Sequence, residues 1–326
     1  MQSQLNSAPG GARALAIFPG ALGDFVCFLP ALCAIARGRG VELCARTEYG
    51  DLLPAHIHAR SIERRDIGQL FVTGADLRET EEFFRQFEFV YSWSGSGDAV
   101  LRENFARAAG SKGRLFTFRP AAARTHIIDY YLACVGAPPG AQPAVAIKPD
   151  ALDWARAWLR ANGLEGARLL AVAPGSGATE KNWPREYFRE VIEWWERSPG
   201  GKGRSPSGKV SVVLGPAEEA EYAFWTEHAP VARGLSLGQL AALLSMADVY
   251  LGNDSGVTHL AAAVGAKTVA LFGPTSPAEW APRGRDVEII SLGVECSPCD
   301  GPAMKICPHR KCLTTLMPRE VIAVLE

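Results

Sequence analysis

The sequence predicts an α/β protein built from two Rossmann-like, doubly wound domains. Three observations lead to this expectation. Short apolar runs, suited to buried parallel strands, alternate with stretches of helical periodicity along most of the chain. Several of these runs end in polar turns that contain glycine, and ligands of open parallel sheets bind at such strand ends. The length, 326 residues, is sufficient for two α/β domains of ordinary size.

The first half of the chain supplies one set of alternating elements. Strands are expected at residues 14–18, 41–45, 70–73, 87–93 and 115–118. Helices are expected at residues 25–36, 79–85 and 126–135. Apolar residues recur at helical spacing in the first of these helices, where Pro30 would either kink the helix or delay its regular start. Alternation of this kind predicts a parallel, doubly wound sheet.

A stretch rich in Pro, Ala and Gly at residues 138–149 is interpreted as the interdomain connection. We therefore place one domain at residues 1–148, a second at 149–318 and a short C-terminal helix at 319–326. Strands of the second domain are expected at residues 168–173, 210–214, 249–251 and 268–272. Its helices are expected at residues 154–162, after Pro184, and at 237–246 with Ser236 as the N-cap. Residues 198–209 have the composition of a surface loop.

Composition describes a globular protein with no global charge signal. Hydrophobic residues make up 48% and charged residues 21%, and the formal net charge is −1, so nothing indicates nucleic-acid binding. A local basic stretch at residues 102–126 suits either an anionic partner or a solvated surface. The chain has no apolar run of 18 residues, and its polar N-terminus lacks the apolar core of a signal peptide. We therefore expect a cytoplasmic protein without a transmembrane span.

The turn after the expected strand 249–251 is the most informative stretch. Asp254 or Ser255 can cap the following helix, whose free N–H groups and dipole suit an anion such as a phosphate. Gly256 has no Cβ to keep a ligand away from the backbone. The alternative is a capped helix that binds nothing. A second turn, Gly273 to Pro277, follows the next strand and completes half of a nucleotide-binding domain.

The turn Pro19 to Asp24 places a carboxylate at the carboxyl edge of the first expected sheet. Asp24 could act on a bound substrate there, or it could serve only as an N-cap. The turn lacks the Lys-Ser/Thr of a P-loop and the GxGxxG spacing of a dinucleotide fingerprint. A nicotinamide-dependent oxidoreductase is therefore disfavoured.

Taken together, these motifs resemble the ADP-heptose:lipopolysaccharide heptosyltransferase family. NDSGVTHLAAAVGAKTVALFGPT, residues 253–275, is similar to the C-terminal signature of that family, and GDFVCFLPAL resembles its N-terminal GDxxxxxPAL motif. The resemblance implies the GT-B architecture, in which two Rossmann-like domains face each other across a cleft. It implies that Asp24 is the general base, and that Lys181, before the Trp-Pro pair, contacts phosphates. It also implies that the last helix crosses back onto the N-terminal domain.

The resemblance places the nucleotide sugar on the second domain. Among the two adjacent acids after strand 210–214, we favour Glu219 over Glu218 for the ribose hydroxyls. His259 either donates to a phosphate or packs at the helix start. The expected nucleotide-sugar-binding residues are Gly175, Ser176, Thr179, Lys181, Glu218, Glu219, Asp254, Ser255, Gly256, Thr258 and His259. The expected acceptor-side residues are Gly23, Ser94, Arg119 and Arg124.

The cysteines fall into two groups. Cys27, Cys33, Cys44 and Cys134 lie in apolar contexts that suit core thiols. The others form a cluster with spacing that could hold a structural metal, Zn or Fe, although free thiols and disulfides remain alternatives. This cluster consists of Cys296, Cys299, Cys307 and Cys312.

The implied activity is inverting transfer of heptose from ADP-heptose to an acidic, lipid-linked oligosaccharide of the lipopolysaccharide inner core. Inversion is a single displacement in which the acceptor hydroxyl loses its proton, so a positioned carboxylate helps. No divalent metal is strictly required if Lys181 and helix dipoles stabilise the diphosphate. Peripheral association with the inner membrane would follow from a lipid-linked acceptor. The alternatives are another nucleotide sugar, a protein or O-antigen acceptor, or a non-catalytic protein that binds sugar nucleotides.

Overall fold

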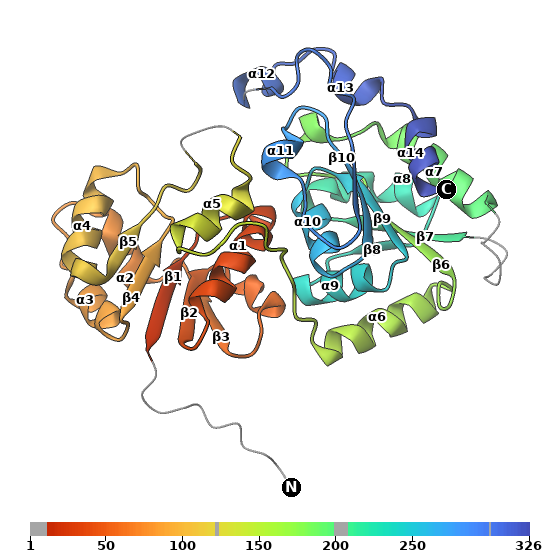
Figure 1. The fold of residues 1–326 in the computed structure, drawn as a ribbon. Helices are drawn as coiled ribbons and strands as arrows, with labels where there is room; N and C mark the ends of the chain where they lie inside the picture. Colours follow the sequence, from red (N-terminus) through yellow and green to blue (C-terminus); the bar gives the residue numbers. More distant parts are fainter. Residues whose placement is uncertain (1–11, 121–123, 199–207, 300) are drawn as a thin grey trace, which may run out of the picture.

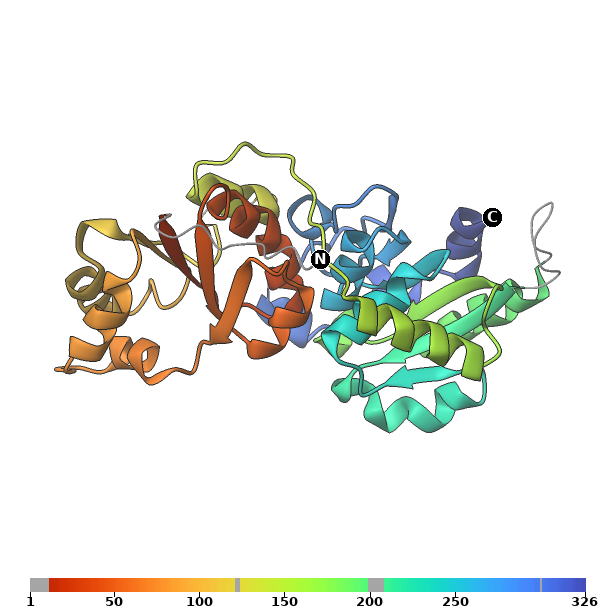
Figure 2. The ribbon, with the colours of Figure 1, turned by 90° about the horizontal axis from the view of Figure 1, so that it is seen from below.

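Two parallel sheets, one in each half of the chain, form the framework of the protein. The structure, a computed structural model, describes residues 12–120, 124–198, 208–299 and 301–326. The sheets lie side by side in two lobes, and the segment between α5 and α6 crosses from one lobe to the other along one side of the molecule (Figure 1, Figure 2). The expected N-terminal stretch, and most of the loop expected at residues 198–209, lie outside the described residues.

The first sheet has five strands in the order β3-β2-β1-β4-β5, and all its neighbouring strands pair in parallel. Its strands are β1 (Arg13–Ile17), β2 (Gly40–Ala45), β3 (Ile57–Ser61), β4 (Phe89–Ser92) and β5 (Gly113–Leu115). Its helices are α1 (Leu22–Ile35), α2 (Arg65–Gly68), α3 (Arg78–Arg85), α4 (Ala99–Ala109) and α5 (Ile127–Cys134). The strand order reverses between β1 and β4, which is where ligands of such sheets bind.

The second sheet has six parallel strands in the order β11-β10-β9-β6-β7-β8, which is the full dinucleotide-binding order read from β6. Its strands are β6 (Arg168–Ala173), β7 (Gly208–Leu214), β8 (Val231–Arg233), β9 (Val249–Asn253), β10 (Lys267–Leu271) and β11 (Val287–Ile290). Its helices are α6 (Pro149–Ala161), α7 (Arg185–Arg197), α8 (Tyr222–Thr226), α9 (Leu237–Ser245), α10 (Gly256–Ala263), α11 (Pro277–Trp280), α12 (Gly301–Lys305), α13 (Lys311–Thr314) and α14 (Pro318–Leu325). The predicted fold class, two Rossmann-like domains, is confirmed.

Each sheet is covered on both faces by apolar side chains of helices. In the first domain α1 and α5 cover one face, while α2, α3 and α4 cover the other. In the second domain α9 and α10 cover one face, and α7 and α14 cover the other. One apolar cluster runs without interruption from α1 and α5 of the first domain to α9 and α10 of the second. The two domains are therefore joined by a shared core beside the cleft.

Several expectations about single elements are wrong. Residues 70–73 do not form a strand: Gln69–Phe71 is a short 3₁₀-helix, and β3 fills the sheet edge instead. The C-terminal helix does not pack on the first domain. Val321 and Leu325 of α14 join the apolar cluster around α7, so this helix completes the second domain. Pro30 does not delay α1, which runs continuously through it with the proline ring buried.

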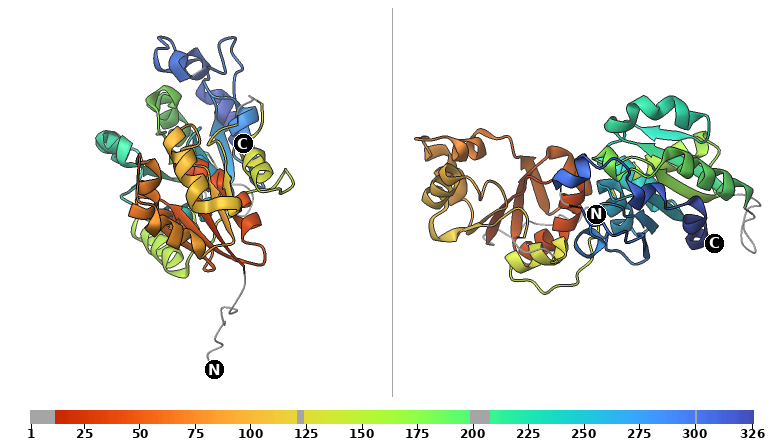
Figure 3. Two further views of the ribbon diagram at one scale, coloured as in Figure 1. Left: turned by 90° about the vertical axis from the view of Figure 1, so that its left-hand side faces the viewer. Right: turned by 90° about the horizontal axis from the view of Figure 1, so that it is seen from above.

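A polar seam also ties the domains together. Arg283 forms two hydrogen bonds to the Asp129 carboxylate, at 2.7 and 2.6 Å, and Nε2 of His126 lies 2.9 Å from the carbonyl oxygen of Ala281. The segment that follows α11 therefore docks on α5, and α11 itself lies at the boundary of the two lobes in the right-hand view of Figure 3. We call these contacts the α5 seam. In the described part of the chain, no helix is long and apolar enough to cross a membrane.

Candidate active site

A cavity of about 250 Å³ lies between the domains, at the carboxyl edges of both sheets. Five strands lead into it, because the segments after β1, β5, β6, β9 and β10 all contribute lining residues. The lining residues are Ala21, Gly23, Asp24, Arg119, Gly177, Lys181, Asp254, Ser255, Gly256, His259, Thr275 and Trp280. Residues predicted from separate motifs, about 230 positions apart in the chain, thus meet in one place.

Asp24 is the third residue of α1 and supplies the carboxylate of the first domain. Its Oδ2 accepts a hydrogen bond from the N–H of Ala21 at 3.3 Å, so it completes a capping arrangement without being the N-cap itself. Its Oδ1 faces Arg119, whose Nη1 lies 2.5 Å away. The side chain is 12% exposed. One oxygen therefore stabilises the helix start while the other is directed into the cavity.

Arg119 reaches Asp24 from the segment after β5 and is held between two aromatic rings. Its guanidinium carbon lies 4.5 Å from the ring centroid of Phe118 and 4.4 Å from that of Trp280, which belongs to the second domain. Of the expected acceptor-side residues, Gly23 and Arg119 line the cavity. Ser94 and Arg124 do not, since Ser94 is buried behind β4 and the N–H of Arg124 donates to Glu279.

Lys181 and Asp254 form an ion pair on the opposite wall. The Lys181 Nζ lies 3.1 Å from Asp254 Oδ2, and the Thr275 hydroxyl donates to the same oxygen at 2.7 Å. Both side chains are largely buried, with 19% and 8% exposed. Asp254 Oδ1 has no partner among the residues that the structure describes. The pair thus fixes a cation at the cavity wall and leaves one carboxylate oxygen to accept a hydroxyl.

The turn before α10 is capped by Ser255. The Ser255 Oγ accepts the N–H of Thr258 at 3.4 Å, which decides between the two N-cap residues considered from the sequence. Thr258 itself is fully buried, and its hydroxyl lies 2.9 Å from the Tyr250 hydroxyl and donates to the Asn253 carbonyl. Its side chain is therefore structural, and the expected contact of Thr258 with the nucleotide sugar stays a prediction. Ser255 and Gly256 remain at the cavity.

The turn after β6 is braced mainly by its own side chains. Ser176 Oγ lies 2.6 Å from the carbonyl oxygen of Ala178 and 2.7 Å from Asn182 Oδ1, so its hydroxyl is engaged. Thr179 is exposed and presents its carbonyl to Arg310. Gly177 lines the cavity, whereas Gly175, Ser176 and Thr179 do not. The predicted turn is thus in place, but the residue of this turn that faces the cavity is Gly177, next to the expected Ser176.

The two candidate ribose acids have different surroundings. Glu218 is partly buried, accepts the N–H of Gly215 at 3.0 Å and packs on Gly175, where any Cβ would clash with it. Burial raises the pKa of the Glu218 carboxyl above its usual range. Glu219 is exposed and pairs with Arg233. Neither residue lines the cavity itself, so the preference for Glu219 lacks structural support.

His259 is 5% exposed and lines the cavity from the first turn of α10. Burial lowers the pKa of its imidazole to about 4, although the carboxylates of Asp254 and Asp24 oppose that shift. The ring is therefore neutral near pH 7. Its Nδ1 lies 3.4 Å from the sulfur of Cys27, which comes from α1 of the first domain.

Sequence reasoning missed several residues that build this site. Asn253 is fully buried; its amide donates to the Pro174 carbonyl at 2.6 Å and accepts the Trp183 N–H at 2.9 Å. It thereby locks the turns after β6 and β9 together. Thr275 and Asn253 lie inside motifs that the sequence analysis singled out. Their place in these turns could therefore have identified them as site residues. Trp280 carries no local signal, because its role depends on the approach of the first domain.

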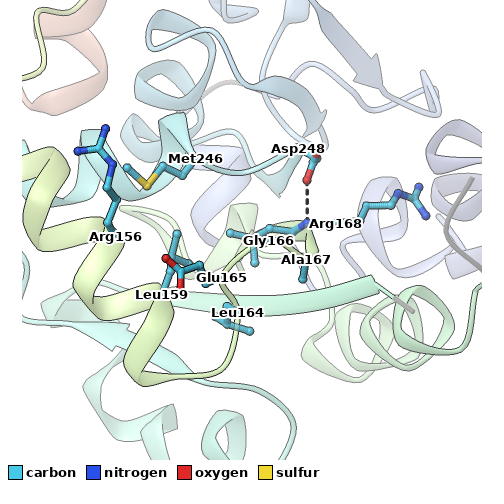
Figure 4. A pocket seen from close by; sticks show the side chains of 10 residues that line it. Arg156, Leu159, Leu164, Glu165, Gly166, Ala167, Arg168, Met246 and Asp248 are labelled. Atoms are coloured by element: carbon cyan, nitrogen blue, oxygen red, sulfur yellow. Dashed lines mark hydrogen bonds between the residues drawn. The ribbon is translucent and has the colours of Figure 1, made fainter. Parts of the chain in front are cut away.

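A larger cavity, of about 620 Å³, lies at the opposite, amino edge of the second sheet (Figure 4). It is lined by the end of α6, the start of β6 and the residues before β9. Asp248 in its wall accepts the N–H of Leu169 at 2.9 Å, and Glu165 pairs with Arg160 at 2.9 Å. Its carboxylates are thus already engaged in structural contacts, so we place the chemistry at the cleft.

The four cysteines of the cluster do not gather into a metal site among the residues that the structure describes. In the described residues, no group of three or more His, Cys, Asp or Glu side chains could hold a metal ion, and all four sulfurs are free thiols. Cys299 donates to the carbonyl of Cys296, Cys307 lies beside His309, and Cys312 is buried. The metal suggested by the spacing is therefore not supported by the geometry.

Two parallel Rossmann sheets, with a cavity between their carboxyl edges, define the two-domain architecture of GT-B glycosyltransferases. The particular family follows from comparison with known proteins. Residues 120–306, more than half of the chain, match the sequence model of glycosyltransferase family 9 (heptosyltransferase), and the chain belongs to this family.

Individual relatives agree with this assignment. The chain is 30% identical over 185 residues to lipopolysaccharide heptosyltransferase 1 of Pseudomonas aeruginosa, a match that covers 49% of this chain and 48% of the relative. The chain thus spans about half the length of the curated relatives it matches. Two solved Escherichia coli structures are similar in fold over 96% of this chain. ADP-heptose lipopolysaccharide heptosyltransferase II has a TM-score of 0.70 at 16% identity over 97% of its length. Heptosyltransferase WaaC with ADP has a TM-score of 0.60 at 17% identity over 98% of its length.

Proposed function

We propose that this protein transfers heptose, with inversion, from ADP-heptose to an anionic, lipid-linked saccharide acceptor of the lipopolysaccharide core. One observation carries the proposal: Asp24 of the first domain and Lys181, Asp254 and His259 of the second line the same cavity. A base and a diphosphate-stabilising wall are the two parts that a single displacement at an anomeric carbon requires. The names of the relatives support this choice of donor, since these are heptosyltransferases and one was solved with ADP.

On the donor side, we propose that the diphosphate lies against the start of α10. The N–H groups of its first turn and the positive end of its dipole face the cavity at Ser255 and Gly256. Lys181 adds a fixed cation, which Asp254 holds in place. Asp254 Oδ1 would accept a hydroxyl of the donor sugar. These groups neutralise the charge that develops on the leaving diphosphate, so the proposed mechanism uses no divalent metal or other cofactor.

For the ribose, the geometry favours Glu218 over Glu219. Glu218 is held at the carboxyl edge of β7 by the N–H of Gly215 and packs on the turn after β6 that borders the cavity. Glu219 points to solvent and is already paired with Arg233. A carboxylate at the end of the second strand is the usual partner of ribose hydroxyls in sheets of this order.

On the acceptor side, Asp24 would take the proton of the attacking hydroxyl. Its Oδ1 is ion-paired with Arg119, so the carboxylate becomes available only when Arg119 turns to another anion. An acidic group on the acceptor would provide that anion. This requirement supports an acceptor that carries carboxylates or phosphates, as an inner-core saccharide on lipid does. The reaction would then take place at the cytoplasmic face of the inner membrane, with the protein bound peripherally.

The test is transfer by wild type and by Asp24→Asn. Asparagine keeps the size of the side chain but cannot accept the proton, so we expect the transfer rate to fall by about 10² to 10⁴-fold while ADP-heptose binding persists. Binding is measured by titration calorimetry and transfer by mass spectrometry of the acceptor. Unchanged transfer would remove Asp24 from the mechanism.

A thermal-shift screen of ADP, UDP and GDP separates ADP-heptose from other donors. Binding of a nucleotide sugar without transfer to any saccharide or protein acceptor would indicate a non-catalytic protein.

A further inference from the structure

Cys27 and His259 meet across the domain interface directly beside the cavity. Cys27 lies one helical turn after Asp24 on α1, and it is fully buried. Its sulfur lies 3.4 Å from Nδ1 of His259 on α10, within hydrogen-bonding reach for sulfur. The core of the fold does not require this pairing, because an apolar residue could fill the same space beside the shared apolar cluster.

The second ring nitrogen of His259 is the unpartnered polar atom of this arrangement. His259 is 5% exposed and lines the cavity, and its Nε2 has no hydrogen-bond partner among the described residues. Nε2 is not among the side-chain nitrogen and oxygen atoms that are both fully buried and without a hydrogen-bond partner. Since it has no partner, it must be accessible, and the accessible space beside it is the cavity. The adjacent Cδ2 lies close to Gly23, another lining residue, where a Cβ would stand 3.4 Å from it. Nδ1 thus faces the thiol, and Nε2 faces the space that a ligand would occupy.

We propose that Cys27 is a positioning residue: its S–H donates to Nδ1 of His259, which holds the imidazole as the Nε2–H tautomer and aims a donor at the anionic diphosphate of the nucleotide sugar. This inference rests on the proposed function, and it chooses between a ligand-binding and a merely packing role for His259.

Two physical arguments select this tautomer over its alternative. The neutral ring has one acceptor nitrogen and one N–H, and a thiol sulfur is a weak acceptor, whereas an imidazole nitrogen is a strong one. Burial raises the pKa of the Cys27 thiol, so it keeps its proton. The cavity also holds the carboxylates of Asp24 and Asp254, and their field favours an N–H over a lone pair at Nε2.

The arrangement couples the two domains in one step. Helix α1 carries both the proposed base and the thiol that orients His259, one turn apart. The approach of α1 to α10 therefore delivers the carboxylate and completes the donor site together. An open form of the protein would lack both.

The tautomer can be measured without any activity assay. ¹⁵N-histidine-labelled full-length protein, free of ligand, should show a protonated Nε2 and an unprotonated Nδ1 for His259, assigned by comparison with His259→Gln. The Cys27→Val variant, which keeps the volume but has no donor, should show a mixture of tautomers, and Cys27→Ser should restore the Nε2–H form. A wild-type Nδ1–H form, or an unchanged tautomer in Cys27→Val, would overturn the proposal. If Cys27→Val fails to fold, the wild-type tautomer still decides.

Kinetics supply the second readout. We expect Cys27→Val to lower kcat for heptosyl transfer about tenfold, as for a lost hydrogen bond to a charged group, and Cys27→Ser to recover most of that loss. Equal loss in both variants, with the wild-type tautomer retained, would reduce Cys27 to a packing residue and contradict the proposal. A wild type that transfers no heptose would refute the proposed function. The NMR result would still decide whether Cys27 sets the tautomer of His259.

Discussion

Glu218 and Glu219 are adjacent in the chain, yet only one of them is fixed in place. Glu218 accepts a backbone N–H and lies on Gly175, whereas Glu219 extends into solvent toward Arg233. Hydrogen bonds to a ligand contribute most where the protein group is already ordered and partly desolvated. The structure thus distinguishes two residues that the sequence alone could not separate.

We therefore expect Glu218→Gln to weaken ADP binding about tenfold, since it replaces a carboxylate that accepts ribose hydroxyls by an amide. Glu219→Gln is the matched control and should change the Kd less than twofold. Titration calorimetry with ADP measures both. Adenosine without the diphosphate should show the same difference, because the contact is to the nucleoside. A larger effect of the Glu219 substitution would show that Glu219, which the sequence favoured, binds the ribose hydroxyls.

At the scale of secondary-structure elements, the starts of α1 and α10 face each other through two glycines. A Cβ on Gly256 would stand 2.8 Å from the Gly23 nitrogen and 3.0 Å from Leu22 Cβ. The first of these atoms belongs to the backbone, which cannot rotate out of the way. The close approach of the two helix starts, and with it the distance between Asp24 and the donor site, depends on the absence of both side chains.

Gly256→Ala should accordingly push the helix starts apart and lower kcat/KM for transfer at least tenfold, because misplacement of reacting groups by about 1 Å can cost about 10²-fold in rate. ADP affinity should fall as well, because the proposed diphosphate site uses the N–H groups of the same helix start. Gly68→Ala is the control: its Cβ would meet nothing within 4 Å, in a helix far from the cleft. Equal activity of wild type and Gly256→Ala would show that the helix starts separate during turnover.

The elements near the site could be predicted from the sequence because their patterns are local. The strands that precede Asp24, Lys181 and Asp254 are short apolar runs followed by glycine-containing turns, and both properties are readable in a single stretch. Leu70 also looked like a strand residue, but it is the buried residue of a 3₁₀-helix, while the less apolar β3 pairs with β2. Pairing partners and burial decided that choice, and they are properties of the assembled sheet.

The same distinction explains what was missed at the site. Trp280 stacks on Arg119 and Cys27 contacts His259, and each pair joins residues more than 150 positions apart, on different domains. No spacing within a motif reports such a contact. Thr258 shows the reverse case, because its motif suggested a ligand contact while its hydroxyl is consumed by Tyr250 and Asn253.

For the whole molecule, two titrating groups at the domain interface should respond to different pH ranges. Burial lowers the pKa of His259 to about 4, below its ordinary value of 6.5. The hydrogen bonds from Arg283 lower the pKa of Asp129 in the α5 seam to about 2, below its ordinary value of 3.8. Between pH 6.5 and 4 the unfolded chain binds a proton at His259 that the folded protein excludes, so stability falls as pH falls. The carboxylate of Asp129 stays ionised throughout that range, so its contribution is lost only as pH drops from 3.8 toward 2.

We therefore expect the thermal unfolding midpoint of wild type to fall between pH 7 and pH 4, and that of His259→Gln to fall less steeply. Over this range, wild type should lose at most about 3 kcal/mol more of its free energy of unfolding than the variant. Asp129→Asn should behave differently. It weakens the seam at every pH above 4, so its midpoint should run below that of wild type with the same slope. Differential scanning calorimetry at half-unit pH steps separates the two patterns. Parallel curves for wild type and His259→Gln would mean that the imidazole titrates freely, and that the interface around Cys27 is open to solvent rather than closed over the catalytic cleft.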